Sequence, residues 1–328
     1  NMISDPVMMR DENSDPNAEH PFIRVFRNPD NTPIARVAEI RDASAESNTL
    51  LQEVFGVEKA LIAPATSAPE FKQTRTKGTM QKIPQALREI AARVTKRPYR
   101  LREDMQRVRQ ALDIHTIGLV AGMVDLNEKI THQARRKAAE SKNDDIWRGI
   151  LRLQEFEESL TESGKGFFHF LPKIWSQQRA GLSENLVNPQ TDKFQRHNVT
   201  MKAWRTTVDP KADDQVLINF KLAIAQGMGL KVDKQLNEDS LAQFEGLLEN
   251  ETVLAALEAL DKIASLPEGE KLDQEDQAAI LAAVKLGGEN THSLDALVNL
   301  NQYVRSLESG QPFETDIMFE VDGVTNGP

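Results

Sequence analysis

The sequence predicts a mainly α-helical protein with a small antiparallel β component. Most of the stretch from 101 to 307 repeats apolar residues every three or four positions, which is the pattern of amphipathic helices. Strand-like stretches are short by comparison, and the clearest is the aromatic and β-branched run F-F-H-F-L-P-K-I-W at 167–175. A chain of 328 residues, 39% of them hydrophobic, is long enough for two or three domains with cores of their own.

Residues 1–70 are expected to form an N-terminal lead-in that is partly irregular. Asp, Asn, Pro and Glu are frequent in its first 33 positions, which show little periodicity. The pattern at 45–55 predicts one helix here, which Gly56 would end.

Residues 71–165 are expected to combine a basic segment with a helical hairpin. Between 72 and 109, twelve lysines and arginines face only three acidic residues, in a chain whose net charge is −10. Two interpretations stay open for these cations, namely contact with phosphates or an ordinary solvated helix face. Helical patterns at 101–124 and 144–163 flank a polar connector, so they should pack antiparallel as an arm, with Asn143, Asp144 and Asp145 as N-cap candidates.

Residues 166–328 should begin as extended chain and continue as a series of helices. The N-P-Q sequence at 188–190 marks a turn, and Arg179, Lys193, Arg196 and His197 lie near it in the sequence. This second basic patch fits a nucleotide or backbone contact and fits a rim of surface cations equally well. Helices are expected at 213–228, 238–249, 251–264, 274–285 and 293–307, with Asn237 and Asp273 as caps.

Composition and missing motifs exclude several classes of function. The chain has no cysteine, so disulfides, thiolate metal sites and a Cys nucleophile are excluded, and its six histidines form no helix-spaced zinc pair. It contains no Walker-type G-x-x-x-x-G-K, no dinucleotide glycine fingerprint, no H-E-x-x-H and no G-x-S-x-G. No apolar run is long enough to span a bilayer, so we expect no membrane partner.

The last ten residues, F-E-V-D-G-V-T-N-G-P at 319–328, deliver one carboxylate to a strand end. Ile317, Phe319 and Val321 alternate with polar or flexible side chains, and Gly and Asn then accept the positive φ of a tight turn. By itself, Asp322 before Gly323 is more typical of a turn residue than of a metal ligand. The order of the other parts of the chain favours the metal.

The order of the parts resembles that of single-subunit DNA-directed RNA polymerases of phages and mitochondria. The parts are, in order, a helical hairpin, an arginine ahead of N-P-Q, a helical stretch and a strand ending D-G-V-T-N-G-P. The chain resembles most closely the virion-packaged RNA polymerases of N-four-like podophages. V-D-G-V-T-N-G-P resembles palm motif A of that family, and S-Q-Q-R at 176–179 resembles its T-x-x-G-R motif without the Thr and Gly. The stretch at 218–232 resembles a helix of the family's palm.

The resemblance implies a partial right-hand polymerase, with a thumb-like arm at 71–165 and the first part of the palm, with a helical insert, at 166–328. It implies template-dependent nucleotidyl transfer at two Mg²⁺ ions, which need hard oxygen ligands. Asp322 would bind the metals with the backbone carbonyl of Gly323, and Arg179 would contact template, RNA or the incoming nucleotide. The expected partners are NTPs, the RNA product and a DNA template that is single-stranded or carries a hairpin promoter.

The family's second metal-binding Asp and nucleotide-gripping helix follow motif A. We therefore expect this chain alone to be catalytically incomplete, with a second polypeptide or a missing C-terminal portion carrying the rest of the palm and fingers. The expected location is the phage virion, the host cytoplasm or both. The alternative is a helical virion protein that binds nucleic acid or builds structure without chemistry. The residues expected to bind nucleic acid are Lys72, Arg75, Lys77, Lys82, Arg93, Lys96, Arg97, Arg100, Lys193 and Arg196.

Overall fold

The computed structural model describes residues 63–318 except 77–80, 127–132, 176–179, 213, 231, 233–235, 268 and 289, and it describes three short strands nearer the N-terminus. The strands are β1 (Val7–Met8), β2 (Arg24–Arg27) and β3 (Pro33–Ile34), which form an antiparallel sheet in that order within a unit spanning Asn1–Leu61. The second compact unit is Ile62–Pro328. The helix expected at 45–55 lies outside the described residues.

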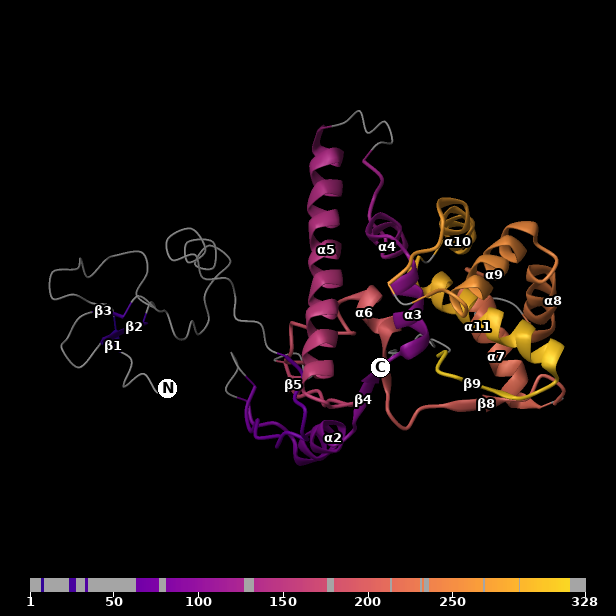
Figure 1. Cartoon of the computed structure of the whole chain (residues 1–328). Coiled ribbons are helices and arrows are strands. Elements are labelled where there is room, and N and C mark those ends of the chain that lie inside the picture. The colour runs from indigo at the N-terminus through magenta and orange to yellow at the C-terminus, as the bar shows by residue number, and fades with distance from the viewer. Residues whose placement is uncertain are drawn as a thin grey trace. The chain divides into compact units, whose positions relative to one another are not determined.

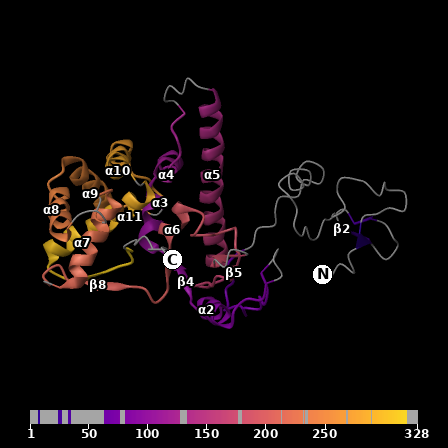
Figure 2. The ribbon, with the colours of Figure 1, turned by 180° about the vertical axis from the view of Figure 1, so that it is seen from behind.

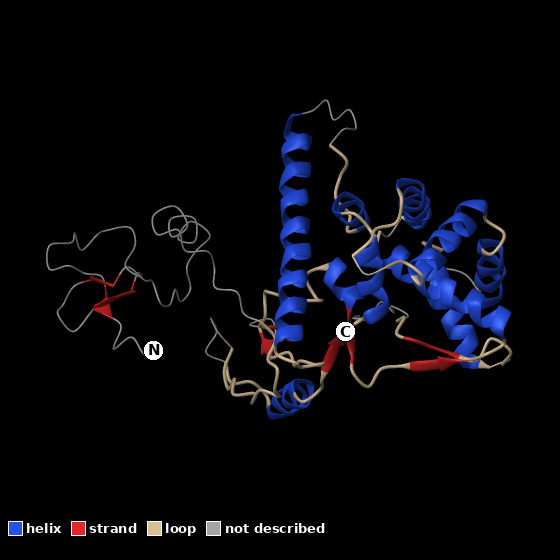
Figure 3. Cartoon of the chain, in the orientation of Figure 1, coloured by secondary structure: helices blue, strands red, loops and turns tan. Residues whose placement is uncertain are grey.

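The second unit is mainly helical with small antiparallel sheets, which confirms the predicted fold class (Figure 3). Its helices before residue 200 are α2 (Gln85–Thr95), α3 (Glu103–Ala111), α4 (Ile114–Val120), α5 (Gln133–Glu162) and α6 (Lys193–Asn198). Its later helices are α7 (Gln215–Gly227), α8 (Asn237–Leu247), α9 (Glu251–Ile263), α10 (Gln274–Gly287) and α11 (Thr291–Ser309).

Three strand pairs join segments of this unit, and in two of them the partners lie far apart in the sequence. The strands are β4 (Tyr99–Leu101), β5 (Pro172–Ile174), β6 (Ala180–Leu182), β7 (Val199–Met201), β8 (Thr206–Val208) and β9 (Phe313–Thr315). The pairs are β4 with β7, β5 with β6, and β8 with β9, all antiparallel. The pairing of β8 with β9 brings the two ends of the segment containing α7 to α11 together (Figure 1).

The arm differs from the sequence prediction at both of its helices. The pattern at 101–124 is interrupted after α3, because the side chain of Asp113 accepts a hydrogen bond from the Thr116 amide and caps a new helix, α4. The second helix begins at Gln133 because the connector is rich in good helix formers such as Ala, Arg and Lys. Asn143 is therefore not an N-cap, and its amide instead bonds both backbone groups of Val124.

The five helices expected after residue 212 are confirmed with small shifts at their ends. Asp273 caps α10 by accepting from the Asp276 amide, as expected. Asn237 is the first residue of α8 and caps nothing, because the N-cap position belongs to Leu236. At the start of α9, Asn250 accepts hydrogen bonds from the amides of Thr252 and Val253.

Helix α11 is the centre of the main hydrophobic core. Every residue from 291 to 301 is buried, which marks a helix surrounded by other elements rather than an amphipathic surface helix. It contacts α3, α6, α7, α9, α10 and β9. Figure 2, seen from behind, shows α7 to α10 grouped with α11. A smaller cluster of Ile83, Ala91 and Ile174, with Phe71 and Leu87 packed against it, joins α2 to β5. Among the described helices, none has the length and apolar character needed to cross a membrane.

Candidate functional site

The residues expected to carry catalysis lie outside the part of the chain that the structure describes. These residues are Arg179, Asp322 and Gly323. Lys77, an expected nucleic-acid contact in the basic segment, also lies outside that part. Their roles therefore stay predictions. The structure does describe the residues that lead to Asp322, and it describes most of the basic segment.

Two buried contacts hold the chain just before residues 319–328, the stretch that contains the resemblance to motif A. Asp316 accepts two hydrogen bonds from Arg100 Nη2, at 2.7 and 2.6 Å, and both side chains are largely buried. The hydroxyl of Thr315 donates to Asn299 Oδ1 on α11. A buried ion pair with short charge-assisted bonds is geometrically specific, so the segment six residues before Asp322 is held against β4 and α11.

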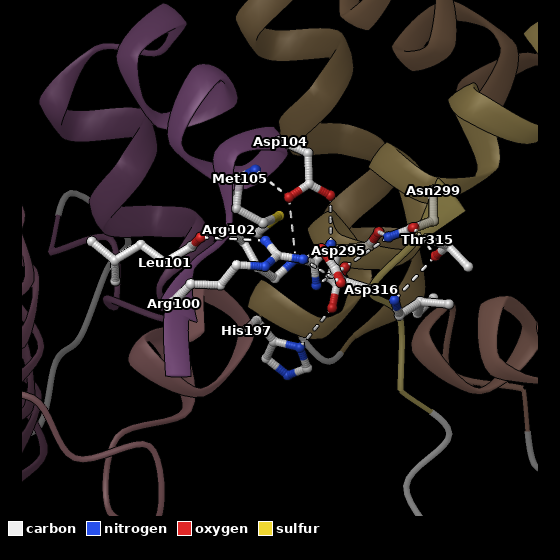
Figure 4. Close-up of polar contacts among 11 residues, drawn as sticks. Arg100, Leu101, Arg102, Asp104, Met105, His197, Asp295, Asn299, Thr315 and Asp316 are labelled. Carbon is white, nitrogen blue, oxygen red and sulfur yellow. Dashed lines mark hydrogen bonds and ion pairs between the residues drawn. The ribbon is translucent and has the colours of Figure 1, made fainter. Parts of the chain in front are cut away.

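Arg102 and Asp295 form the centre of this polar network, as Figure 4 shows. Arg102 Nη1 lies 2.7 Å from Asp295 Oδ1, Nη2 lies 2.7 Å from Asp104 Oδ2, and Arg102 and Asp295 each expose only 2% of their side chains. His197 Nδ1 is 3.0 Å from the other carboxylate oxygen of Asp295. Asn299 also donates to Asp295, so the buried carboxylate has three side-chain partners, which come from α6, from α11 and from the junction between β4 and α3.

The network holds its two central charges in their ionised forms. Burial alone would raise the pKa of the Asp295 carboxyl, but Arg102 and His197 hold that pKa at about 2. Burial would lower the pKa of Arg102, whereas the attraction of Asp295 and Asp104 raises it above its ordinary value. The ring of His292 stacks on His197 with centroids 4.8 Å apart. The charges of Arg102 and Asp295 neutralise each other, so this buried pair holds together the segments that it joins.

The described residues hold no preformed metal centre, because no group of three or more His, Asp or Glu among them is arranged around a common point. The carboxylates nearest to Asp322 in the described sequence are already paired. Asp316 is bound to Arg100, and Glu314 lies 3.1 Å from Arg205 Nη1.

The first part of the basic segment pairs with itself as a short antiparallel ribbon, which we call the hairpin, and α2 follows it. Arg75 and Lys82 are cross-strand neighbours, and backbone hydrogen bonds join Thr76 to Gln81 and Ile83 to Thr74. Like charges directly opposite each other on a ribbon repel, so this pair favours an anion between them. The expected nucleic-acid contacts that are exposed here are Lys72, Arg75, Lys82, Arg93, Lys96 and Arg97.

Several of the expected contacts already have partners within the protein. Arg100 forms an ion pair with Asp316, so a phosphate that bound Arg100 would compete with Asp316. Arg196 donates to the carbonyls of Pro189 and Gln190 and thereby holds the N-P-Q turn, whose position the sequence predicts correctly. Lys72 lies 3.1 Å from Glu70, but both side chains are highly exposed, and such surface pairs contribute little. Lys193 is exposed at the start of α6, one turn before Arg196.

Sequence reasoning misses the buried network and the residue that joins the basic segment to β5. Asp295 and Asn299 stand four apart within the apolar pattern of 293–307, and this polar pair on one helix face is the signal that could have been noticed. The side chain of Gln73 donates to the Ile174 carbonyl at 2.9 Å and accepts from the Ile174 amide at 2.8 Å. It completes the free edge of β5 as a neighbouring strand would.

Two protein-family models match the chain, and together they cover more than half of it. A virion DNA-directed RNA polymerase domain matches residues 86–199, and the plug insertion of virion DNA-directed RNA polymerase matches residues 215–304. The stretch at 218–232, expected to be a palm helix, therefore lies in the plug insertion. A search of curated proteins finds no match.

The buried network spans both matches, with Arg102 and His197 in the first and Asp295 in the second. The chain belongs to the family of virion DNA-directed RNA polymerases.

Proposed function

We propose that this chain supplies the first metal ligand and part of the template grip of an RNA polymerase that transfers nucleotides at two Mg²⁺ ions. The observation that carries the proposal is the Arg100–Asp316 ion pair, which holds the segment entering motif A against the matched polymerase domain. A metal ligand needs such rigid support, because catalysis depends on placing the reacting groups to within a fraction of an ångström.

The chemistry of the terminal stretch fits hard divalent cations. Asp322 supplies a carboxylate oxygen, and Gly323 supplies a backbone carbonyl and lets the backbone approach a metal and a triphosphate closely. When bound, the Mg²⁺ pair would activate the RNA 3′ hydroxyl and stabilise the leaving pyrophosphate. Arg179 would contact template, RNA or the incoming nucleotide, since guanidinium groups suit phosphates.

The remaining partners follow from the same proposal. They are NTPs, the RNA product and a DNA template that is single-stranded or carries a hairpin promoter. A second metal-binding Asp and a nucleotide-gripping helix would come from another part of the polymerase, on this polypeptide or on a second one. The enzyme would act from the virion, in the host cytoplasm or in both.

Purified polymerase that contains this chain should make RNA only when template, all required NTPs and Mg²⁺ are present. Incorporation of labelled nucleotide should stop when a chelator removes Mg²⁺ and return when Mg²⁺ is restored, because the metals carry the charge of the transition state. Template binding without any synthesis under these conditions would instead support a non-catalytic nucleic-acid-binding protein.

Lys82→Gln should weaken binding of single-stranded DNA and make it less dependent on salt. Each phosphate contact on a single strand contributes roughly 0.7 to the slope of log affinity against log salt, so losing one contact should lower the slope by about that amount. The measurement is fluorescence anisotropy of a labelled oligonucleotide across salt concentrations. Lys285→Gln is the matched control, since this exposed lysine lies on α10, outside the basic segment. Equal slopes for both variants would exclude Lys82 from the interface.

A further inference from the structure

Trp175 is a large aromatic side chain that stays half exposed among the described residues. It stands directly after β5, on the face of the strand opposite to Ile174, and exposes 50% of its surface. Ile174 faces the small core shared with α2, and Lys173 and Trp175 point outward, as the alternation of a strand requires. An indole half in water is typical of a recognition surface, because tryptophan combines a large apolar face with low conformational entropy.

The ring of Trp175 is held in place by its neighbours. Gly181 lies opposite Lys173 in the β5–β6 pair, and a Cβ atom at position 181 would stand 2.2 Å from Trp175 Nε1. The indole therefore occupies the space above the glycine backbone that any side chain would fill. Lys173 Nζ lies 5.5 Å from the ring centroid, within the range of a cation–π contact. A ring fixed before binding loses little entropy when a ligand stacks on it.

The neighbourhood of Trp175 is cationic. Gln73 bonds both backbone groups of Ile174, so the hairpin that carries Lys72, Arg75 and Lys82 is tied to the strand one residue before the indole. Lys173 adds a cation on the same strand face. Exposed aromatic rings beside a positively charged track are the arrangement by which proteins hold single-stranded nucleic acids, with bases on the rings and phosphates on the cations.

We propose that Trp175 is a stacking platform for an unpaired nucleobase and that Lys173, Arg75 and Lys82 contact the phosphates beside that base. The proposal rests on the proposed function, since it specifies how the polymerase holds a single strand. The strand is the DNA template or the RNA transcript, because every nucleobase offers a face for stacking.

The test measures coupling between the indole and a base in the polymerase that contains this chain. The probes are a labelled thymidine oligonucleotide of about 12 residues, which fits the usual span of such sites, and the same strand with abasic positions. Trp175→Ala should weaken binding of the thymidine strand about tenfold and leave binding of the abasic strand nearly unchanged. Trp175→Phe should keep most of the affinity, and Gly181→Ala should reproduce the loss because it displaces the ring.

Trp204→Ala is the matched control, since Trp204 is similarly exposed, at 43%, but follows β7 instead of β5. A parallel series with a uridine oligonucleotide assigns the platform to RNA if the loss is confined to it, and to the DNA template if the thymidine strand alone is affected. Equal losses on normal and abasic strands, or unchanged binding of both the thymidine and the uridine strand in Trp175→Ala while the wild type binds them, would overturn the stacking proposal and leave the proposed function standing. Absence of binding by the wild type would contradict the nucleic-acid contact in the proposed function itself.

Discussion

Replacing Asp322 with Ala is expected to abolish RNA synthesis while binding of the DNA template stays nearly intact. A carboxylate that binds catalytic metals stabilises charge that develops in the transition state, an effect of several kcal/mol. A loss of about 4 kcal/mol corresponds to a fall in rate of roughly a thousandfold. Template binding depends on cations elsewhere in the chain and so should not change. The measurements are nucleotide incorporation at saturating template and, separately, template affinity.

Glu320→Ala is the matched control for this substitution. Glu320 lies two residues before Asp322 in the same stretch and has no expected role at the metals. Its variant should keep most of the activity. Synthesis by Asp322→Ala at the wild-type rate would remove Asp322 from the metal site, and an equal loss in both variants would point to a structural defect of the whole stretch.

Replacing Asp295 with Ala is expected to destabilise the unit that contains residues 62–328 by about 3–5 kcal/mol. The substitution leaves Arg102 buried without its partner from α11, and an uncompensated buried charge carries a large desolvation cost. The measurement is the free energy of unfolding from urea titration followed by tryptophan fluorescence. Glu314→Ala removes the exposed partner of Arg205 and should change stability by at most about 1 kcal/mol.

A second variant separates the cost of an unpaired charge from simple loss of packing. Arg102→Met combined with Asp295→Leu removes both charges, so it should destabilise less than Asp295→Ala alone. The Asp295 contribution should also depend on pH. The pKa of about 2 in the folded protein lies below the ordinary aspartate value of 3.8 expected in the unfolded chain, so this stabilisation is present above about pH 4 and is lost as pH falls towards 2. A stability difference between wild type and Asp295→Asn that stays constant across this range would contradict the buried ion pair.

The helices could be predicted because their signals are local. In the five helices after residue 212, apolar residues repeat clearly every three or four positions, and Asp273 marks the start of α10 as its N-cap. The interruption at Asp113 cannot be read from the apolar period, because that period continues through α3 and α4 while the cap breaks the helical hydrogen-bond pattern. Conversely, the sequence pattern predicts too late a start for α5, because a polar connector resembles a loop although its residues favour helix.

The candidate site divides in the same way between local and long-range information. The resemblance to motif A and the cation-rich segment can be read from consecutive residues, so the sequence alone supports the predictions for Asp322 and Lys82, which stay predictions. The pairing of Arg102 with Asp295 and of Arg100 with Asp316 depends on how distant segments fold together. Nothing in a single sequence indicates which of many charges will meet in the core. The exposure of Trp175 likewise follows from the register of β5 with β6.

The pairing of β8 with β9 bears on whether the stretch that matches the plug insertion could be removed from the chain. Thr206 opposes Thr315 and Val208 opposes Phe313, so the two ends of the stretch that contains the plug-insertion match lie side by side, and a short turn could join them if that stretch were removed. Excision would nevertheless strip Arg102 of Asp295 and remove α11 from the centre of the core. The structure of the unit that contains residues 62–328 therefore depends on this stretch, although its two ends lie close enough to be joined without it.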